Sequence, residues 1–383
     1  MEYAGFLLRR ERLKRNWSQE GLCRDICTIS YLSKIEQGKA VPSEDILCLL
    51  MNRMDLDWYP ADSQAETLLE AAYDALFSFD DRLTELLTSA DRQHLVCSPY
   101  GADFLLLEQF TKPSTRVPLD TELESCLSNR QLALQRVLQK RFTDAMHLLP
   151  NGFFVCLAGI HFYEQGNLTA SLELLNQAYR LSSEEGRPRV MLHCKLYLGN
   201  CYSNRHDLIG MESHYQAARR LALALKDDYA MNSIAYNLAA TQIEAGEYSK
   251  ALLYFQALKH PRQMDLHKLA ICCEKLGMVQ EALAALDQAA AQVPESWMPE
   301  GLDSLLLEVV RFRLINPDYR KNPLYGQMLL ECFHRCRQEL PSGYAIFHLN
   351  WVIEWYESNR QYKQALDLLR SFPDAGRNPP LTI

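Results

Sequence analysis

The chain has 383 residues, 48% of them hydrophobic, and its formal net charge at pH 7 is −8. A chain of this length exceeds one simple core, so we expect two or more structural units. The acidic total argues against a protein that coats nucleic acid along its whole length. Residues 1–40 nevertheless carry eight Lys and Arg against five Asp and Glu, so a small basic head precedes a strongly acidic body.

The twelve cysteines are scattered through apolar helical patterns and show no disulfide-type clustering. The first ten residues contain charges and no long apolar run, which argues against a signal peptide. No segment reaches the roughly 18 apolar residues that span a bilayer. We therefore expect a cytoplasmic protein with reduced cysteines and no membrane partner.

Two groups of residues invite a metal interpretation: Cys23 with Cys27, and Cys332 with His334 and Cys336. Neither group has a second ligand pair at the spacing of a zinc site. No glycine-rich phosphate loop, nucleophile elbow or HExxH motif occurs, and the ten histidines are dispersed. We expect no metal, no cofactor and no enzymatic activity.

The segment from Ser18 to Gly38 predicts two short helices that follow each other almost directly. Ser18 and Thr28 each suit an N-cap, because a hydroxyl there accepts a hydrogen bond from a free amide of the first turn. Gly38 suits the end of the second helix. Apolar residues at helical spacing predict a bundle of four or five short helices with these in its core: Phe6, Leu7, Leu8, Leu13, Leu22, Ile26, Leu32, Ile35, Ile46, Leu47, Leu49, Leu50 and Met54.

Residues 3–59 resemble the DNA-binding domain of the Cro-like, XRE-type repressors, in which two such helices form a helix-turn-helix. The matching positions are Arg12, Ser18, Gln19, Glu20, Leu22, Tyr31, Leu32, Ser33, Lys34, Ile35, Glu36, Gln37, Gly38, Pro42 and Ser43. The sequence departs from the pattern in a turn that is one residue shorter than the commonest version, and in Cys23 at a position that is usually Ala. The resemblance implies that Arg12 and Glu36 form a buried pair that ties the first helix to the third.

The second helix of such a pair lies in the major groove of DNA, with its N-terminal residues at the base edges. Serine hydroxyls can donate or accept hydrogen bonds there, and an isoleucine can meet a thymine methyl group. Polar and basic side chains around them can contact phosphates. The predicted DNA-binding residues are Gln19, Thr28, Ile29, Ser30, Tyr31, Ser33, Lys34 and Lys39. The alternative is a structural helical bundle whose polar face is merely solvated.

From about residue 61 onward the sequence is helical in its periodicity, and four sets of residues repeat with gaps of 12, 4 and 3. In each set a small residue lets one helix lie close to the next, and three later residues form the seam of that second helix. The pattern resembles the tetratricopeptide repeat, although the sets start 40, 40 and 31 residues apart. The sets are Gly159, Ser171, Leu175 and Ala178; Gly199, Met211, Tyr215 and Ala218; Ala239, Ala251, Phe255 and Leu258; Ala270, Ala282, Leu286 and Ala289.

We therefore predict an all-α chain in four parts. Residues 1–60 form the helix-turn-helix bundle, and residues 61–119 form a connecting helix with degenerate helical pairs. Residues 120–372 form an α-solenoid of six or seven tetratricopeptide-like helical pairs. Residues 373–383 form a loose tail.

A solenoid presents an extended concave surface, formed mainly by the first helix of each pair. Asn200 and Asn237 are polar residues in otherwise apolar first helices, and an asparagine amide can pair with both the N–H and the C=O of an extended peptide. Lys268 lies at the equivalent face one unit on and can meet a peptide carboxylate, while Tyr197 and Tyr236 can line side-chain pockets. The alternatives are that the asparagines bond to neighbouring helices and that the tyrosines belong to the core.

The two parts together resemble the RRNPP-type regulators of Gram-positive bacteria, which sense signalling peptides. The resemblance implies that a short signalling peptide binds the solenoid and alters dimer geometry and DNA affinity. Independently, one small head offers few base contacts, so we expect a homodimer on a double-stranded DNA operator. The alternative function is a protein-interaction module in which the solenoid docks a folded partner protein.

Overall fold

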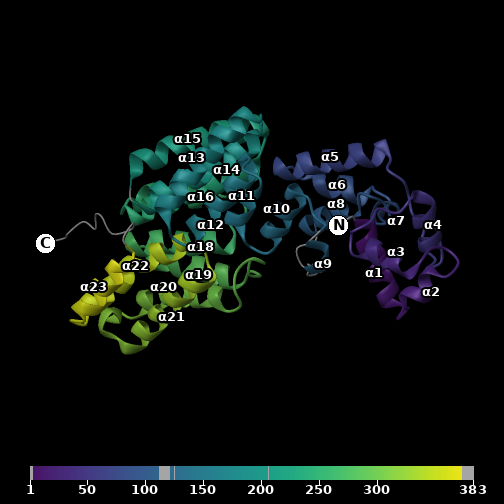
Figure 1. Ribbon diagram of the computed structural model, residues 1–383. Helices are drawn as coiled ribbons and strands as arrows, with labels where there is room; N and C mark the ends of the chain where they lie inside the picture. The colour runs from purple at the N-terminus through teal and green to yellow at the C-terminus, as the bar shows by residue number, and fades with distance from the viewer. Residues whose placement is uncertain (1–2, 112–120, 125, 206, 373–383) are drawn as a thin grey trace. The chain divides into compact units, whose positions relative to one another are not determined.

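The computed structural model describes residues 3–111, 121–124, 126–205 and 207–372. These residues form two compact units: one of residues up to 158 together with 184–190, and one of residues 159–183 together with those from 191 onward. The predicted all-α class is confirmed, because every regular element in the described ranges is a helix (Figure 1). The predicted loose tail, 373–383, lies outside the described residues.

Four short helices form the N-terminal head of the first unit, and the side chains of Leu8, Leu22, Leu32 and Leu50 are fully buried between them. Ser18 and Thr28 cap two of these helices, with each hydroxyl accepting a hydrogen bond from a first-turn amide. The helices are α1 (Tyr3–Lys14), α2 (Gln19–Cys23), α3 (Ile29–Glu36) and α4 (Glu44–Asn52).

Three predicted details of the head are wrong. The helix α2 ends at Cys23 and a turn over 24–28 precedes α3, so the two helices are not almost directly joined. Arg24 ends the helical run with ψ of 130°, Asp25 follows with a left-handed φ of 61°, and Ile26 lies in the turn. Leu13 and Leu49, predicted in the core, are 50% and 53% exposed. Each residue of a helix is rotated by about 100° from the one before it, so these two point to the solvent side of α1 and α4.

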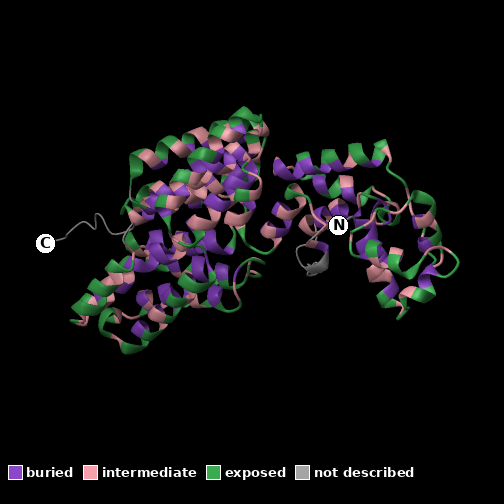
Figure 2. Ribbon diagram, viewed as in Figure 1, coloured by how far each residue is buried: buried purple, intermediate pink, exposed green. Residues whose placement is uncertain are grey.

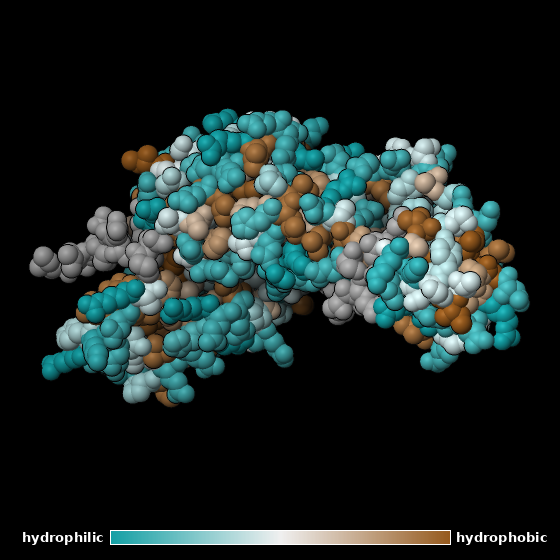
Figure 3. All heavy atoms as spheres, viewed as in Figure 1, coloured by the Kyte–Doolittle hydropathy of each residue, from teal (hydrophilic) through white to brown (hydrophobic). Residues whose placement is uncertain are grey.

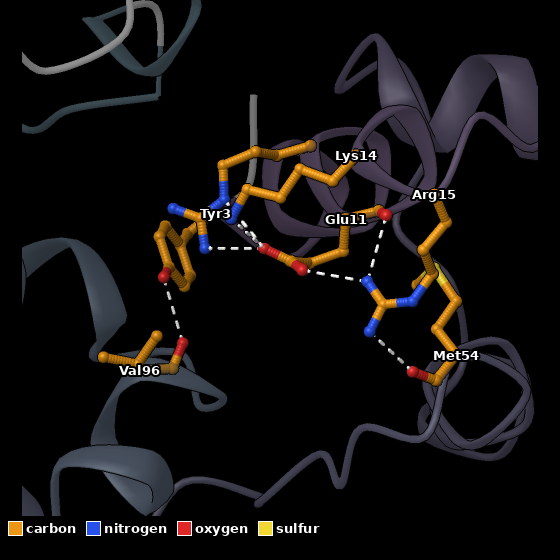
Figure 4. A network of polar contacts seen from close by, with 7 residues as sticks. Tyr3, Glu11, Lys14, Arg15, Met54 and Val96 are labelled. Carbon is orange, nitrogen blue, oxygen red and sulfur yellow. Dashed lines mark hydrogen bonds and ion pairs between the residues drawn. The ribbon is translucent and has the colours of Figure 1, made fainter.

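The core of the head continues beyond residue 60, where the predicted first domain ends. Cys97, Ala102 and Leu123 belong to the same buried cluster as the apolar residues of α1, α3 and α4. The Tyr3 hydroxyl donates a hydrogen bond to the Val96 carbonyl at 2.9 Å, as Figure 4 shows. The head therefore has no separate core of its own.

A second polar network holds α1 against the turn that follows α4. The Glu11 carboxylate accepts hydrogen bonds from Lys14 at 2.8 Å and from Arg15 at 3.0 Å. Arg15 also donates to the Met54 carbonyl at 2.9 Å, which fixes the end of the head (Figure 4).

The rest of the first unit packs short helices around one apolar cluster that includes Tyr73, Phe77, Phe153 and Phe154. Figure 2 shows α5 with buried residues on one side and exposed residues on the other, as expected of an amphipathic helix. The helices after the head are α5 (Ser63–Phe77), α6 (Arg82–Thr88), α7 (Arg92–Val96), α8 (Gly101–Thr111), α9 (Thr121–Glu124), α10 (Asn129–Leu138) and α11 (Phe142–Leu148).

From α10 onward the described part of the chain forms seven consecutive helical pairs. The pairs from α14 onward lie mainly in the second unit, and α12 is divided between the two units. A short 3₁₀ helix, η2 (Tyr319–Lys321), separates α20 from α21. The remaining bounds are α12 (Gly152–Glu164), α13 (Leu168–Glu184), α14 (Pro188–Asn204), α15 (Leu208–Leu225), α16 (Asp228–Glu244), α17 (Tyr248–Gln256), α18 (Gln263–Lys275), α19 (Val279–Ala290), α20 (Leu302–Ile315), α21 (Pro323–Glu339), α22 (Ser342–Ser358) and α23 (Tyr362–Arg370).

The repeated small residues lie where two helices of a pair meet. A Cβ atom added at Gly159 would stand 2.9 Å from Leu175, and one added at Gly199 would stand 2.3 Å from the Tyr215 ring. A larger residue at either position would require the facing side chain to move. Three pairs turn at a glycine with φ of 78°, a conformation that glycine adopts without strain: Gly166, Gly246 and Gly277.

The helical array of the second unit turns so far that its last pair returns to its beginning. The Ser342 hydroxyl at the start of α22 donates to the Tyr163 carbonyl at the end of α12, at 2.9 Å. These two residues are separated by 179 positions in the chain. The concave surface is therefore enclosed at this point rather than open along its length.

Hydrophilic residues cover most of the face drawn in Figure 3, with hydrophobic residues in small patches between them. Throughout the described ranges, each helix is too short or too polar to cross a membrane.

Candidate functional site

The N-terminus of α3 is the exposed edge of the head. The Thr28 hydroxyl accepts a hydrogen bond from the Tyr31 amide at 3.2 Å, which fixes the first turn. Ile29, an apolar residue, is 47% exposed at this end, and Ser30 beside it is exposed. The arrangement presents one methyl-bearing side chain and one hydroxyl beyond the body of the head, which suits contact with base edges.

The other predicted DNA-binding residues differ in how exposed they are and in the hydrogen bonds they make. Lys34 and Lys39 are exposed, and the Lys39 ammonium donates to the Gln37 side chain at 2.8 Å. Ser33 is half-buried and accepts a hydrogen bond from the Gln37 amide at 3.1 Å. The Tyr31 hydroxyl donates to the Val41 carbonyl at 3.3 Å.

The predicted partners Arg12 and Glu36 face each other inside the head. The Arg12 Nε and Nη2 atoms donate to the two Glu36 carboxylate oxygens at 2.6 and 2.7 Å, and its Nη1 atom donates to the Trp17 carbonyl at 2.8 Å. The Gln19 amide joins the same carboxylate at 2.8 Å. Gln19 thus orders the start of α2 from within the head, and its contact with a phosphate stays a prediction.

Two adjoining cavities lie on the concave side of the second unit. The inner cavity has a volume of about 120 Å³ and the outer one of about 470 Å³. They share part of their wall, so together they form one groove, which we call the groove below. The shared residues are Tyr163, Asn200, Tyr236, Asn237, Pro341 and Tyr344.

All five residues predicted to bind a peptide line this groove. Asn200, Tyr236 and Asn237 line both cavities. Lys268 lines the inner cavity only, and Tyr197 lines the outer one. The first helices α14, α16 and α18 position them, as the repeat pattern predicts.

The two asparagines are joined to each other and to a tyrosine. The Asn237 amide nitrogen donates to the Asn200 amide oxygen at 3.0 Å, and the Tyr215 hydroxyl donates to the same oxygen at 2.8 Å. Among the described residues, the Asn200 nitrogen and the Asn237 oxygen carry no further side-chain partner. The pair therefore keeps one donor and one acceptor for a ligand, which is what one peptide group requires.

Lys268 and Glu244 bring opposite charges to the inner cavity without forming an ion pair. The Lys268 ammonium lies over the Phe347 ring, 2.8 Å from its centroid. Burial lowers the pKa of Lys268 to about 7, although the charge of Glu244 opposes this shift. Burial likewise raises the pKa of Glu244 to about 7 against the opposing charge of Lys268.

Sequence patterns did not predict several of the residues that line the groove. Asn204 follows Asn200 by one helical turn, and Glu244 follows Asn237 by two, so helical spacing alone could have indicated both. Tyr163 lies on α12 with its ring 5.5 Å from that of Tyr197, whereas Tyr344 carries no local signal, because it reaches the groove only through the return of α22 to α12. Within the described residues, no group of three or more His, Cys, Asp and Glu side chains is placed to hold a metal ion.

The head matches a known class of DNA-binding domain in a comparison with protein-family models. Residues 4–57 match the family model described as a helix-turn-helix domain, so the predicted helix-turn-helix is confirmed. No curated protein matches the chain.

Solved structures then supply one particular protein of similar fold and a second match at a low TM-score. A Rap protein, crystallised in complex with Competence and Sporulation Factor, is 16% identical with a TM-score of 0.57, over 82% of this chain and 98% of that chain. PlcR of Bacillus thuringiensis, crystallised with the peptide PapR7 and DNA, is also 16% identical, over 82% of this chain and 100% of that chain, with a TM-score of 0.28. The likeness to the Rap protein shows that the two chains share a helical-repeat fold.

Proposed function

We propose that this chain is a sequence-specific DNA-binding transcriptional regulator whose activity is gated by a peptide bound in the groove. The observation that carries the proposal is the pair of asparagines, which offers one free donor and one free acceptor inside a groove of the same chain that carries a helix-turn-helix head. The Rap protein of similar fold was crystallised with Competence and Sporulation Factor, which supports a peptide ligand for this groove.

In this proposal α3 enters the major groove of a double-stranded operator. Ile29, Ser30 and Ser33 meet base edges, since they lie on the first turns of α3. Lys34 and Lys39 contact phosphates, because phosphate contacts orient a reading helix without specifying sequence. The chain acts as a homodimer, so that two heads read two half-sites.

The ligand is a short signalling peptide in extended conformation, which the protein binds in the cytoplasm. The Asn200 nitrogen donates to a peptide carbonyl and the Asn237 oxygen accepts from a peptide amide, while Tyr197 and Tyr236 line pockets for its side chains. The chain has no catalytic role in this proposal. Gating follows because a ligand that binds one curvature of a helical array more tightly shifts the population toward it.

A randomised heptapeptide pool tests the peptide half of the proposal. The full-length protein should retain a subset of the pool, and Asn237→Ala should retain it at least about tenfold less, since removing a buried hydrogen-bonding partner costs about that much. Asn176→Ala, on an exposed position of α13, is the matched control and should behave as the parent. Equal retention by the parent and Asn237→Ala, or capture of folded proteins but no peptide, would contradict the proposal.

A further inference from the structure

The first turn of α22, a helix of 17 residues, lines the inner cavity. Its N-cap is Pro341, which supplies no side-chain hydrogen bond, and the first amides of a helix have no acceptor within the helix. Tyr344 donates its amide to the Pro341 carbonyl at 3.0 Å, but the amides of Ser342 and Gly343 have no acceptor in the described part of the chain. These amides and the helix dipole favour a negative charge at this end of the cavity.

A second donor points to the same place. Asn204 on α14 is 6% exposed and lines the inner cavity, and its amide nitrogen makes no hydrogen bond of standard geometry among the described residues, although the Tyr163 hydroxyl lies beside it. A Cβ atom on Gly343 would stand 3.7 and 3.9 Å from the two polar atoms of this amide, so Asn204 lies against the first turn of α22. A buried donor without an acceptor is costly, which indicates that a ligand supplies one.

The third donor is the ammonium group of Lys268. This residue is 3% exposed, and over the described ranges no hydrogen bond or ion pair joins it to a carboxylate. Its position over the Phe347 ring places it one turn along α22 from Gly343 and Tyr344. Asn204 on α14, Lys268 on α18 and Gly343 on α22 thus each bring a donor-bearing residue to the wall of one cavity.

We infer that the inner cavity is a carboxylate-binding site that anchors one end of the groove ligand through Lys268, Asn204 and the first amides of α22. This inference rests on the proposed function and specifies its ligand: the anchored group is the C-terminal carboxylate of the peptide or an acidic side chain. A ligand ammonium or guanidinium group would leave the Asn204 amide and the α22 amides unpaired and would face Lys268.

Among the described residues, Glu244 is the one carboxylate that lines the inner cavity, and its protonation state sets the proton balance of binding. When a ligand carboxylate binds beside Lys268, Lys268 becomes charged and Glu244 stays protonated, because burial already favours its neutral form. Burial keeps the pKa of His267 and His348 low, so both are neutral near pH 7. The charged or titratable groups whose fields reach Lys268 and its histidine neighbours are Glu244 on α16, His267 and Cys272 on α18, Arg313 on α20, Cys336 on α21 and His348 on α22.

The test compares three heptapeptide pools on the full-length protein. The first has a free C-terminal carboxylate and no Asp or Glu, the second has an amidated C-terminus and no Asp or Glu, and the third is amidated but includes Asp and Glu. The protein should retain the first or the third pool at least about tenfold more than the second, because a charge-assisted hydrogen bond contributes at least that much. The pool that is retained tells the C-terminal carboxylate from an acidic side chain.

Lys268→Met should erase the preference among pools, and removal of a buried unpaired charge leaves the fold intact. Lys250→Met, at an exposed lysine of α17, should keep the preference. Asn204→Asp, which replaces the donor amide with an acidic group, is an independent variant and should lose the preference too. Equal retention of all three pools by the parent protein would overturn the carboxylate anchor and leave the proposed function standing. Retention of no peptide by the parent would overturn the proposed function and the anchor with it, and loss of the preference in Lys250→Met would overturn the anchor alone.

Discussion

At the scale of single residues, the buried pair of Arg12 and Glu36 joins α1 to α3 in the head. The Glu36 side chain is 2% exposed, so Arg12→Ala would leave a buried carboxylate without its bidentate partner. We expect a loss of about 3–5 kcal/mol in the free energy of unfolding of the first unit, measured by urea denaturation. The double variant Arg12→Met, Glu36→Leu should recover most of this loss, since two apolar residues replace the pair. An unchanged urea midpoint for Arg12→Ala would show that the pair does not stabilise the head.

Glu244 makes the stability of the second unit depend on pH. Its pKa in the folded protein is raised from 4.5 to about 7, so its contribution is fully present below pH 4.5 and is lost as the pH rises through 7. Glu244→Gln removes this titration. We expect the variant to match the parent at pH 4.5 and to exceed its free energy of unfolding by about 1–2 kcal/mol at pH 8.

The control for this titration is Glu247→Gln, since Glu247 is exposed and, within the described ranges, forms its ion pair with Lys250 at 2.9 Å. It should leave the pH profile unchanged. Parallel profiles for the parent and Glu244→Gln between pH 4.5 and 8 would contradict the raised pKa.

At the scale of a single element, α3 is the helix predicted to read the DNA sequence. Ser30→Ala removes a base-edge hydroxyl, and we expect it to weaken binding to a selected duplex by about tenfold and to relax sequence preference. Lys34→Ala should weaken binding to all duplexes and lower the slope of log affinity against log salt by about one. Both residues are exposed, so α3 should keep its fold in circular dichroism.

Lys14→Ala is the matched control for α3, because Lys14 is exposed on α1 and pairs with Glu11 away from α3. Its affinity and salt slope should equal those of the parent. If Ser30→Ala and Lys34→Ala also bound as the parent does, α3 would not be the reading helix.

Elements differ in how far the sequence predicts them. The pairs α12 to α19 follow from local spacing, because a glycine or alanine must stand wherever two helices meet at close approach, as Gly199 does against Tyr215. The end of α2 was not predictable, because the backbone leaves the helix at Arg24, and arginine is a residue that suits a helix interior. The repeat spacing likewise located Asn200, Asn237 and Lys268 in one groove.

At the scale of the whole molecule, contacts between distant segments decide what sequence patterns leave open. The head shares its core with Cys97, Ala102 and Leu123, and nothing in the helical periodicity of residues 61–127 indicates this. Gly343 and Tyr344 enter the groove only because the array returns on itself, and so the carboxylate-binding end of the groove has no local signature. Long-range packing of this kind depends on the sum of many pair angles, which spacing does not encode.

The gating of DNA binding by a groove ligand is the central claim, and one titration tests it most directly. A duplex selected from a randomised pool is titrated with the full-length protein at about 150 mM salt, with and without the retained heptapeptides. We predict that the peptides change the dissociation constant for DNA by at least about fivefold, and that Asn237→Ala shows no change. Enrichment of no duplex, or a dissociation constant that stays the same while peptide is bound, would contradict the account.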